Sequence, residues 1–142
     1  MALQEFRPVM RFEARVIGIA QLAAGEALGY GGSFVTERAT RVGVVGCGFG
    51  DGYPSGAATG TPVMIGGVRT RIVGKVAMNV MFVDLEGIPE ARIGDWVTLW
   101  GDANLRIDEV AQHAGQGPEV IQCGMAKKHR VQLIEEDRLC VT

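Results

Sequence analysis

The sequence predicts a mainly β fold, namely a small closed Greek-key-like β-barrel with one short helix. Glycine occurs 21 times in 142 residues, about twice the ~7% of average proteins. The glycines separate short apolar and β-branched runs, a pattern typical of strands joined by tight turns. Because a chain of this length suits one hydrophobic core, we expect residues 1–142 to form a single domain.

Strands are expected wherever a run has the apolar or β-branched content that they require. In chain order these runs are residues 12–20, 41–47, 62–65, 68–73, 76–85, 96–100, 119–122 and 131–134. The clearest connection is Gly66-Gly67, which separates the third run from the fourth. Two glycines tolerate the positive φ angles of a two-residue turn, so this pair predicts a β-hairpin.

The expected helix spans residues 108–115. Apolar side chains recur there at i, i+3, i+4 and i+7, namely at Ile107, Val110, Ala111 and Ala114. Acidic residues occupy the first turn, where the helix dipole favours carboxylates. Gly115 supplies a C-terminal stop. We expect this helix to be short and isolated, with strands before and after it.

Composition excludes several classes of protein. The sequence is 47% apolar with a formal net charge of −2, as in a globular protein and unlike a disordered one. Its one basic cluster, residues 127–130, is too narrow for a nucleic-acid footprint. No apolar stretch approaches the ~20 residues of a membrane helix. The N-terminus is charged where a signal peptide would be apolar, so we expect a cytoplasmic protein that binds neither nucleic acid nor membrane.

The cysteines predict no metal site and no disulfide framework. Cys47, Cys123 and Cys140 are odd in number, widely spaced and form no Cys-x-x-Cys pair. Structural zinc requires four ligands, and a second ligand pair beside Cys123 and His129 is missing. We therefore expect reduced thiols and no bound metal.

A glycine-rich stretch, residues 46–53, follows the second expected strand and raises the question of a dinucleotide loop. Its spacing does not fit, because Asp51 stands where the third glycine would be needed. Pro54 also prevents a prompt helix, whose N-terminus would bind a phosphate. We expect instead a backbone surface that another group approaches closely, with Asp51 capping its turn.

Tyr30 is the most informative candidate for chemistry. Its neighbours Gly29, Gly31 and Gly32 leave little around the phenol, so a second surface can reach the hydroxyl. A phenol in such a position is suited to acid–base work, with a reference pKa near ~10 that neighbours would have to lower. The alternative interpretation is a plain turn residue.

Short motifs then follow one another in order between about residues 7 and 115. They include Pro8-Val9-Met10, Gly29-Tyr30-Gly31-Gly32, Gly48-Phe49-Gly50-Asp51-Gly52-Tyr53-Pro54, Val73-Gly74-Lys75-Val76-Ala77-Met78-Asn79 and Val83-Asp84. In this order they resemble the C-terminal β domain of alanine racemase.

The resemblance implies one part of a two-part enzyme. In that family an N-terminal TIM barrel holds pyridoxal phosphate on a lysine, and each active site of a head-to-tail dimer lies between one barrel and the other subunit's β domain. The resemblance assigns Tyr30 as the base on one face of the substrate. It implies that the Met78 backbone binds the substrate carboxylate, and that Phe49 lies in the substrate pocket.

Several positions depart from the family pattern. Phe49 replaces a tyrosine, Asn79 replaces an aspartate, and Pro118-Glu119 stands where a Tyr-Glu pair would bind the cofactor phosphate. No lysine lies in a context that resembles the pyridoxal phosphate lysine. We therefore expect the isolated chain to bind no cofactor and to be inactive without a barrel.

Three hypotheses follow for function. The first is a racemase domain that supplies Tyr30 and a pocket wall to a barrel domain or partner subunit. The second is a non-catalytic derivative that binds a ligand or protein through the same face. The third is an unrelated small β-barrel binding module. In the first two, the face around Tyr30 and Phe49 would be apolar when uncovered, so homodimerisation is a further hypothesis.

Overall fold

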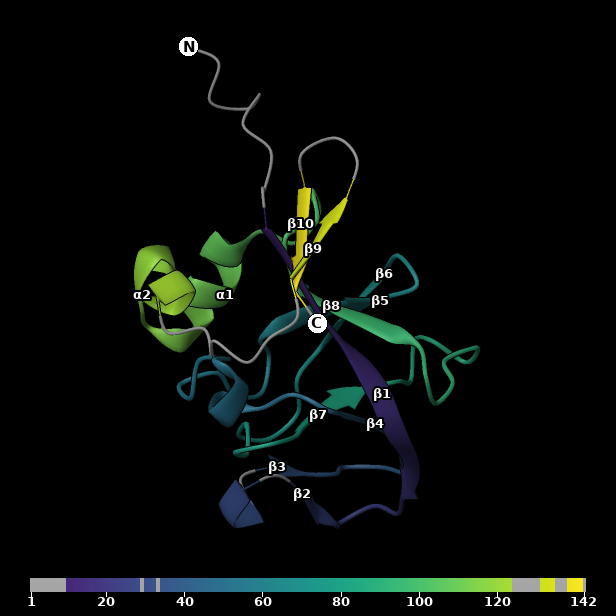
Figure 1. The fold of residues 1–142 in the computed structure, drawn as a ribbon. Coiled ribbons are helices and arrows are strands. Elements are labelled where there is room, and N and C mark those ends of the chain that lie inside the picture. The colour runs from purple at the N-terminus through teal and green to yellow at the C-terminus, as the bar shows by residue number, and fades with distance from the viewer. Residues whose placement is uncertain (1–9, 29, 33, 124–130, 135–137, 142) are drawn as a thin grey trace.

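The structure, a computed structural model, describes residues 10–28, 30–32, 34–123, 131–134 and 138–141, without the side chains of Tyr30 and of residues from 122 onward. Figure 1 shows a mainly β molecule with two helices beside the strands. The basic cluster at 127–130 lies outside the described residues, as does His129.

The sheet is organised around one long strand, β1 (Met10–Leu22). Its first part pairs with β8 (Trp96–Trp100), and its second part pairs with β4 (Thr40–Val45), both antiparallel. The register shifts between Val16 and Gly18, in the ladder with β4. Such irregularities bend a strand, so β1 can serve both partners as the sheet curls.

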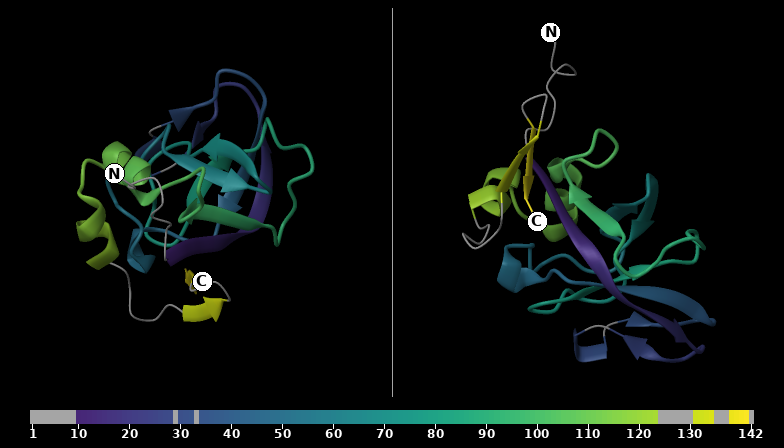
Figure 2. Two further views of the ribbon diagram at one scale, coloured as in Figure 1. Left: turned by 90° about the horizontal axis from the view of Figure 1, so that it is seen from above. Right: turned by 45° about the vertical axis from the view of Figure 1, so that its right-hand side comes forward.

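Antiparallel pairing continues on both sides of β1. β4 pairs with β7 (Met81–Asp84), and β8 pairs with β5 (Pro62–Ile65), which pairs with β6 (Val68–Arg71). An isolated bridge between Ile72 and Val83 is the pairing that joins the end of β6 to β7. The result is a strongly curled sheet of six antiparallel strands (Figure 2). Closure into a Greek-key barrel would need a full ladder of hydrogen bonds between β6 and β7, and it stays a prediction.

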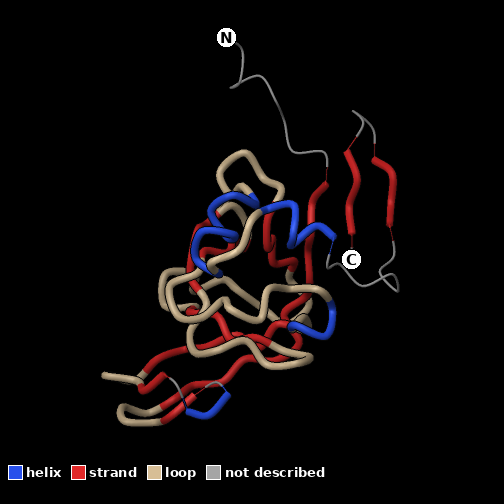
Figure 3. The backbone as a smooth tube through the Cα atoms, turned by 90° about the vertical axis from the view of Figure 1, so that its left-hand side faces the viewer, coloured by secondary structure: helices blue, strands red, loops and turns tan. Residues whose placement is uncertain are grey.

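Two further strands extend the sheet at the start of β1. β10 (Arg138–Val141) pairs with β1 in parallel, and β9 (Val131–Ile134) pairs with β10 in antiparallel fashion. The strand expected at 131–134 is thus confirmed. At the opposite end of the molecule a separate two-stranded sheet, β2 (Ala27–Leu28) and β3 (Phe34–Val35), forms an arm (Figure 3).

The hydrophobic core fills the inside of the curled sheet. Its largest buried side chains are aromatic: Phe12 and Tyr53 both pack on Trp100, with ring centroids 4.8 and 5.8 Å away. β5 is buried along its whole length, as expected for a strand covered on both faces. These aromatic contacts dominate the core because each ring buries a large area.

Local signals placed two elements correctly. Gly66 and Gly67 have φ angles of 57° and 81°, and they join β5 to β6 as the predicted hairpin turn. The helix α1 (Ile107–Ala114) ends at Gly115, whose φ of 71° is the left-handed C-cap conformation. Val110 and Ala111 of α1 are buried against the core.

Two sequence predictions are wrong. Residues 119–122 form part of a second helix, α2 (Pro118–Cys123), and not a strand, so the prediction of one helix fails. Proline at the first helical position favours a helix start, a signal that outweighs the short apolar run. The strand expected at 76–85 is confined to β7, because the preceding residues 77–79 pair with a loop instead.

Candidate active-site face

Tyr30 lies at the turn of the arm. It begins a 3-10 turn, Tyr30–Gly32, between β2 and β3. Gly31 and Gly32 have φ angles of 72° and 65°, a region that side chains rarely adopt, so the two glycines shape this turn. The side chain of Tyr30 is not among the side chains that the structure describes.

Thr36 closes the base of the arm. It is buried, and its hydroxyl donates to the Ala23 carbonyl at 2.7 Å and accepts from the Glu26 amide at 2.9 Å. Backbone bonds from Gly25 N–H to Thr36 O and from Thr36 N–H to Glu26 O complete the closure. These bonds all lie within the arm, so they fix its base without tying its turn to the main sheet.

The glycine-rich loop presents Phe49 beside Met78. The Phe49 N–H donates to Ala77 O at 3.0 Å, and the Gly50 N–H donates to Met78 O at 2.8 Å. A Cβ on Gly48 would lie 2.2 Å from Ala77 O, a distance that real Cβ atoms do not reach. The predicted close approach to this loop is thus confirmed, and the approaching group is the backbone of Ala77 and Met78.

Asp51 stabilises the same loop. Its Oδ2 accepts from the Gly48 N–H at 3.1 Å, and its own N–H donates to Gly48 O at 3.0 Å. The predicted capping role of Asp51 is therefore confirmed. Gly52 follows with a φ of 98° and ends the turn.

The side chains that this loop presents are exposed and apolar. Phe49 is 43% exposed, Met78 is 59% exposed and Val120 of α2 is 55% exposed. Phe49 and Val120 line a shallow hollow of about 250 Å³, which Ser55 and Gln116 also line. Large exposed apolar side chains close together mark a surface for binding, so this face is suited to being covered.

Buried neighbours of the loop contribute packing. Tyr53 is 1% exposed, and burial raises its pKa, so its phenol stays neutral and stacks on Trp100. Burial and then the charge of Asp51 raise the pKa of Cys47 to about 12, which leaves this thiol protonated and unreactive. Neither side chain is available for acid–base chemistry.

The predicted site residues lie on separate segments of the fold. Phe49 and Met78 lie side by side, and Asn79 follows on the same exposed segment. The backbone of Tyr30 lies in the turn between β2 and β3, on the separate arm. Two surfaces are therefore present, a turn bearing Tyr30 and a face bearing Phe49 and Met78.

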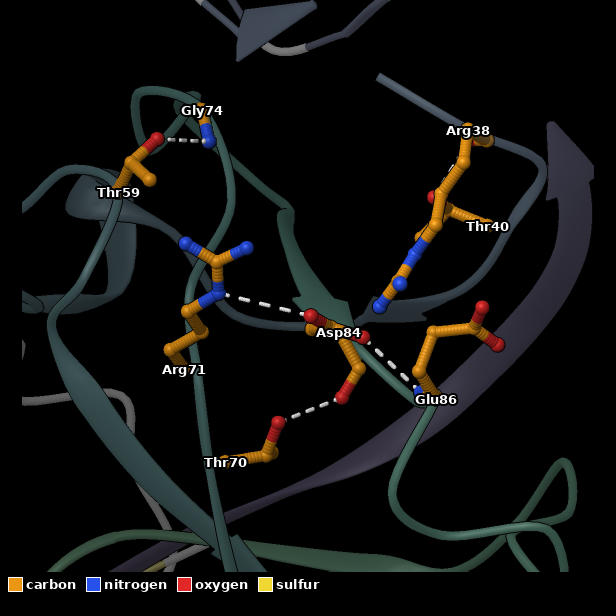
Figure 4. Close-up of polar contacts among 8 residues, drawn as sticks. All are labelled: Arg38, Thr40, Thr59, Thr70, Arg71, Gly74, Asp84 and Glu86. Atoms are coloured by element: carbon orange, nitrogen blue, oxygen red, sulfur yellow. Dashed lines mark hydrogen bonds and ion pairs between the residues drawn. The ribbon is translucent and has the colours of Figure 1, made fainter. Parts of the chain in front are cut away.

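A polar hollow of about 460 Å³ lies at the base of the arm, and no sequence pattern predicted it. Charged side chains line it, including Arg38, Arg71, Asp84 and Glu86 (Figure 4). They come from positions far apart in the sequence: the segment after β3, β6, the end of β7 and the turn that follows it. Only their tertiary arrangement brings them together.

Two kinds of functional feature are absent from the described residues, a metal site and a helix that could span a membrane. Within that part of the chain, no group of three or more His, Cys, Asp or Glu side chains is arranged to hold a metal ion. Among the same residues, no helix has the length and apolar character to cross a membrane.

Comparisons with known proteins identify the fold and its family. A family profile described as "Alanine racemase, C-terminal domain" matches residues 9–134. An alanine racemase from Bordetella petrii is 50% identical over 122 residues, a match that covers 86% of this chain and 32% of that protein. Among solved structures, biosynthetic alanine racemase from Pseudomonas aeruginosa aligns with a TM-score of 0.78 and 43% identity, covering 82% of this chain and 32% of that one.

A second solved structure includes the cofactor. Alanine racemase from Bartonella henselae, with covalently bound pyridoxal phosphate, aligns with a TM-score of 0.76 and 28% identity over 81% of this chain and 32% of that one. These matches define a C-terminal β domain. The chain belongs to the alanine racemase family, and it spans about a third of the length of the relatives it matches.

The described residues do not fit an anchored pyridoxal phosphate by themselves. Lys75 is the one lysine within the described ranges, and it lies exposed on the segment after β6. It lines neither the hollow beside Phe49 nor the hollow beside Arg71. A cofactor bound at this face would therefore depend on residues other than these.

Proposed function

We propose that this chain completes the active site of an alanine racemase by covering a barrel domain that carries pyridoxal phosphate. The supporting observation is the close approach of Gly48 and Gly50 to Ala77 and Met78. This contact joins the two segments that carry the exposed apolar side chains of Phe49 and Met78. Such a face loses water-exposed apolar area when a second surface covers it.

Each predicted residue has a role in this proposal. Racemisation removes a proton from one side of a carbon atom and returns a proton on the other, so it needs a group on each side. We assign the Tyr30 phenol to one side, with its pKa lowered by groups of the barrel. The Met78 backbone would bind the substrate carboxylate, and the Phe49 ring would exclude water from the pocket wall.

The isolated chain is proposed to be inactive, because it supplies one base and no cofactor anchor. The test mixes the purified chain with the pyridoxal phosphate-loaded N-terminal two-thirds of the Bordetella petrii relative. Interconversion of D- and L-alanine is then measured with a D-amino-acid oxidase assay. We expect activity from the mixture and none from either part alone.

The two tyrosines of the chain provide matched variants. Tyr30→Phe should lower the activity of the mixture by about 10²- to 10⁴-fold, the usual contribution of a general acid–base group. Tyr53→Phe changes a buried side chain in the core and should leave the activity within about two-fold. Equal activity of Tyr30→Phe and the unmodified chain would refute the role of Tyr30.

A second candidate is a non-catalytic derivative that binds a ligand or a protein through the same face. The absence of a hydroxyl at Phe49 and the 43% exposure of its ring favour this alternative. It predicts that the mixture associates without activity. Homodimerisation through the Phe49 face belongs to either proposal, and sedimentation velocity at increasing concentration tests it.

A further inference from the structure

The arm that bears Tyr30 forms a two-stranded sheet of its own. We define the arm as residues 23–36, of which 29 and 33 are not described. β2 and β3 pair with each other and with no strand of the larger sheet. Among the described residues, the backbone hydrogen bonds at the base of the arm, made by Gly25 and Thr36, are internal to it. Side-chain contacts with the larger sheet therefore contribute to the position of the turn.

The polar hollow lies where close packing would otherwise hold the arm. Phe34 and Val35 of β3 line one side of this space of about 460 Å³, and Arg71 of β6 and Asp84 of β7 line another. Folded proteins are rigid where their side chains are densely packed. A hollow at this place means that β3 gains little support from packing, so each contact across it matters more.

One described side-chain contact crosses the hollow. The guanidinium carbon of Arg71 lies 5.7 Å from the centre of the Phe34 ring, within the range of a cation–π interaction. Arg71 is itself held by Asp84, since its Nε lies 3.5 Å from Asp84 Oδ2 (Figure 4). The side chain of Asp84 is 19% exposed and that of Arg71 is 47% exposed, so the fixed partner is the aspartate.

Asp84 is held from three directions. Its Oδ1 accepts from the Glu86 N–H at 2.9 Å, and its carbonyl accepts from the Thr70 hydroxyl at 2.6 Å. Its backbone pairs with Val42 in the ladder between β4 and β7. A carboxylate fixed in this way gives the guanidinium of Arg71 a defined position beneath Phe34.

We propose that Asp84 and Arg71 are positioning residues, which hold Phe34 and thereby set where the arm presents Tyr30. The inference rests on the proposed function in one respect, the use of Tyr30 as a base. Phe34 follows the turn that begins with Tyr30, on the next strand of the same two-stranded sheet. A change in the position of β3 therefore moves the turn.

The expected effect is small and local. A cation–π contact at an exposed site shifts an equilibrium by about two- to five-fold, so its loss should raise the open population of the arm by that factor. The bonds of Thr36 keep the base closed, so the global unfolding transition should not move.

The experiment follows the arm directly in the purified chain. Hydrogen exchange by NMR reports the amides of β2, β3 and the glycines of the turn. Incorporation of 3-fluorotyrosine gives two ¹⁹F signals, one from Tyr30 and one from the buried Tyr53, which serves as an internal reference. Neither measurement requires racemase activity, so failure of this inference can be distinguished from failure of the proposed function.

Five variants, including one control and one double variant, separate the contributions. Arg71→Ala removes the guanidinium, Phe34→Leu removes the ring and Asp84→Asn keeps the shape of the carboxylate without its charge. The matched control is Arg69→Ala, on the same strand with a side-chain exposure of 45%, because Arg69 pairs with Glu109 of α1 and not with the arm. The double variant of Arg71 and Phe34 tests whether the two side chains act together.

The proposal predicts a two- to five-fold faster exchange of arm amides and a shifted or broadened Tyr30 signal in Arg71→Ala and Phe34→Leu. Asp84→Asn should change the exchange rate of the arm amides in the same direction. The double variant should show an exchange rate equal to that of the single variant with the larger effect. In all of them the Tyr53 signal and the unfolding midpoint should stay unchanged. Unchanged arm exchange in Arg71→Ala, or an equal effect of Arg69→Ala, would overturn the inference.

Discussion

Replacement of Gly48 by alanine tests the contact that brings Phe49 and Met78 together. The backbone of Gly48 has φ −145° and ψ −166°, an extended conformation that alanine adopts without strain. The added Cβ would nevertheless lie 2.2 Å from Ala77 O and 2.5 Å from the Met78 carbonyl carbon and oxygen. The perturbation is therefore purely a close contact between two backbone segments.

The magnitude follows from the bonds that the clash would break. To relieve it, the loop must move away from residues 77–79, which breaks the bonds from Phe49 N–H to Ala77 O and from Gly50 N–H to Met78 O. Each bond contributes about 1 kcal/mol, and overpacking adds about 1–3 kcal/mol. We expect Gly48→Ala to lower the free energy of unfolding by about 3–5 kcal/mol.

Urea unfolding followed by tryptophan fluorescence measures this loss. Gly87→Ala is the matched control, because a Cβ at Gly87 meets no atom within 4 Å and its φ is not positive. That control should leave stability unchanged or raise it by up to about 1 kcal/mol. If Gly48→Ala costs less than about 1 kcal/mol, the close contact and the reasoning built on it are wrong.

Three other predictions concern titratable or buried side chains. Tyr53→Phe removes a buried hydroxyl that has no hydrogen-bond partner among the described residues, so urea unfolding should show unchanged or higher stability; a loss above about 1 kcal/mol would contradict this expectation. Cys47, with its pKa raised to about 12, should resist iodoacetamide at pH 8, measured in a variant that lacks the other two cysteines. Alkylation of the folded chain as fast as that of the urea-unfolded chain would contradict the burial of this thiol. The Arg69 side chain lowers the pKa of Glu109, so the pair adds stability above the unfolded pKa and loses it as pH falls through the lowered folded pKa. Both side chains are more than a third exposed, so Glu109→Gln should cost less than about 1 kcal/mol at pH 7 and nothing near pH 2; a difference that persists at pH 2 would contradict the electrostatic origin.

Local sequence signals predicted the elements that depend on nearest neighbours. The glycine pair at 66–67 determines the β5–β6 hairpin because both positions need positive φ. Gly115 ends α1 for the same reason. The run at 119–122 misled the prediction, because four apolar and polar residues do not distinguish strand from helix by their period alone. Pro118 was the available signal for the helix.

Contacts between distant segments could not be predicted in this way. The glycine-rich loop indicated that some group approaches it, but only the folded chain shows that the backbone of Ala77 and Met78 is that group. The parallel pairing of β10 with β1 joins the two ends of the sequence, and no local pattern specifies such a partner. The Arg71–Asp84 pair and its contact with Phe34 are likewise invisible to spacing along the chain.

The sequence by itself determined the mainly β character, the turns, the first helix and the resemblance to one family, because these depend on residue type and order. It also singled out Tyr30, Phe49 and Met78 as candidates. The tertiary structure decided which of them meet: Phe49 and Met78 share one face, whereas Tyr30 lies on a separate arm. The physical reason is that close approach and hydrogen bonding between segments are set by the three-dimensional path of the backbone, which local conformational preferences do not fix.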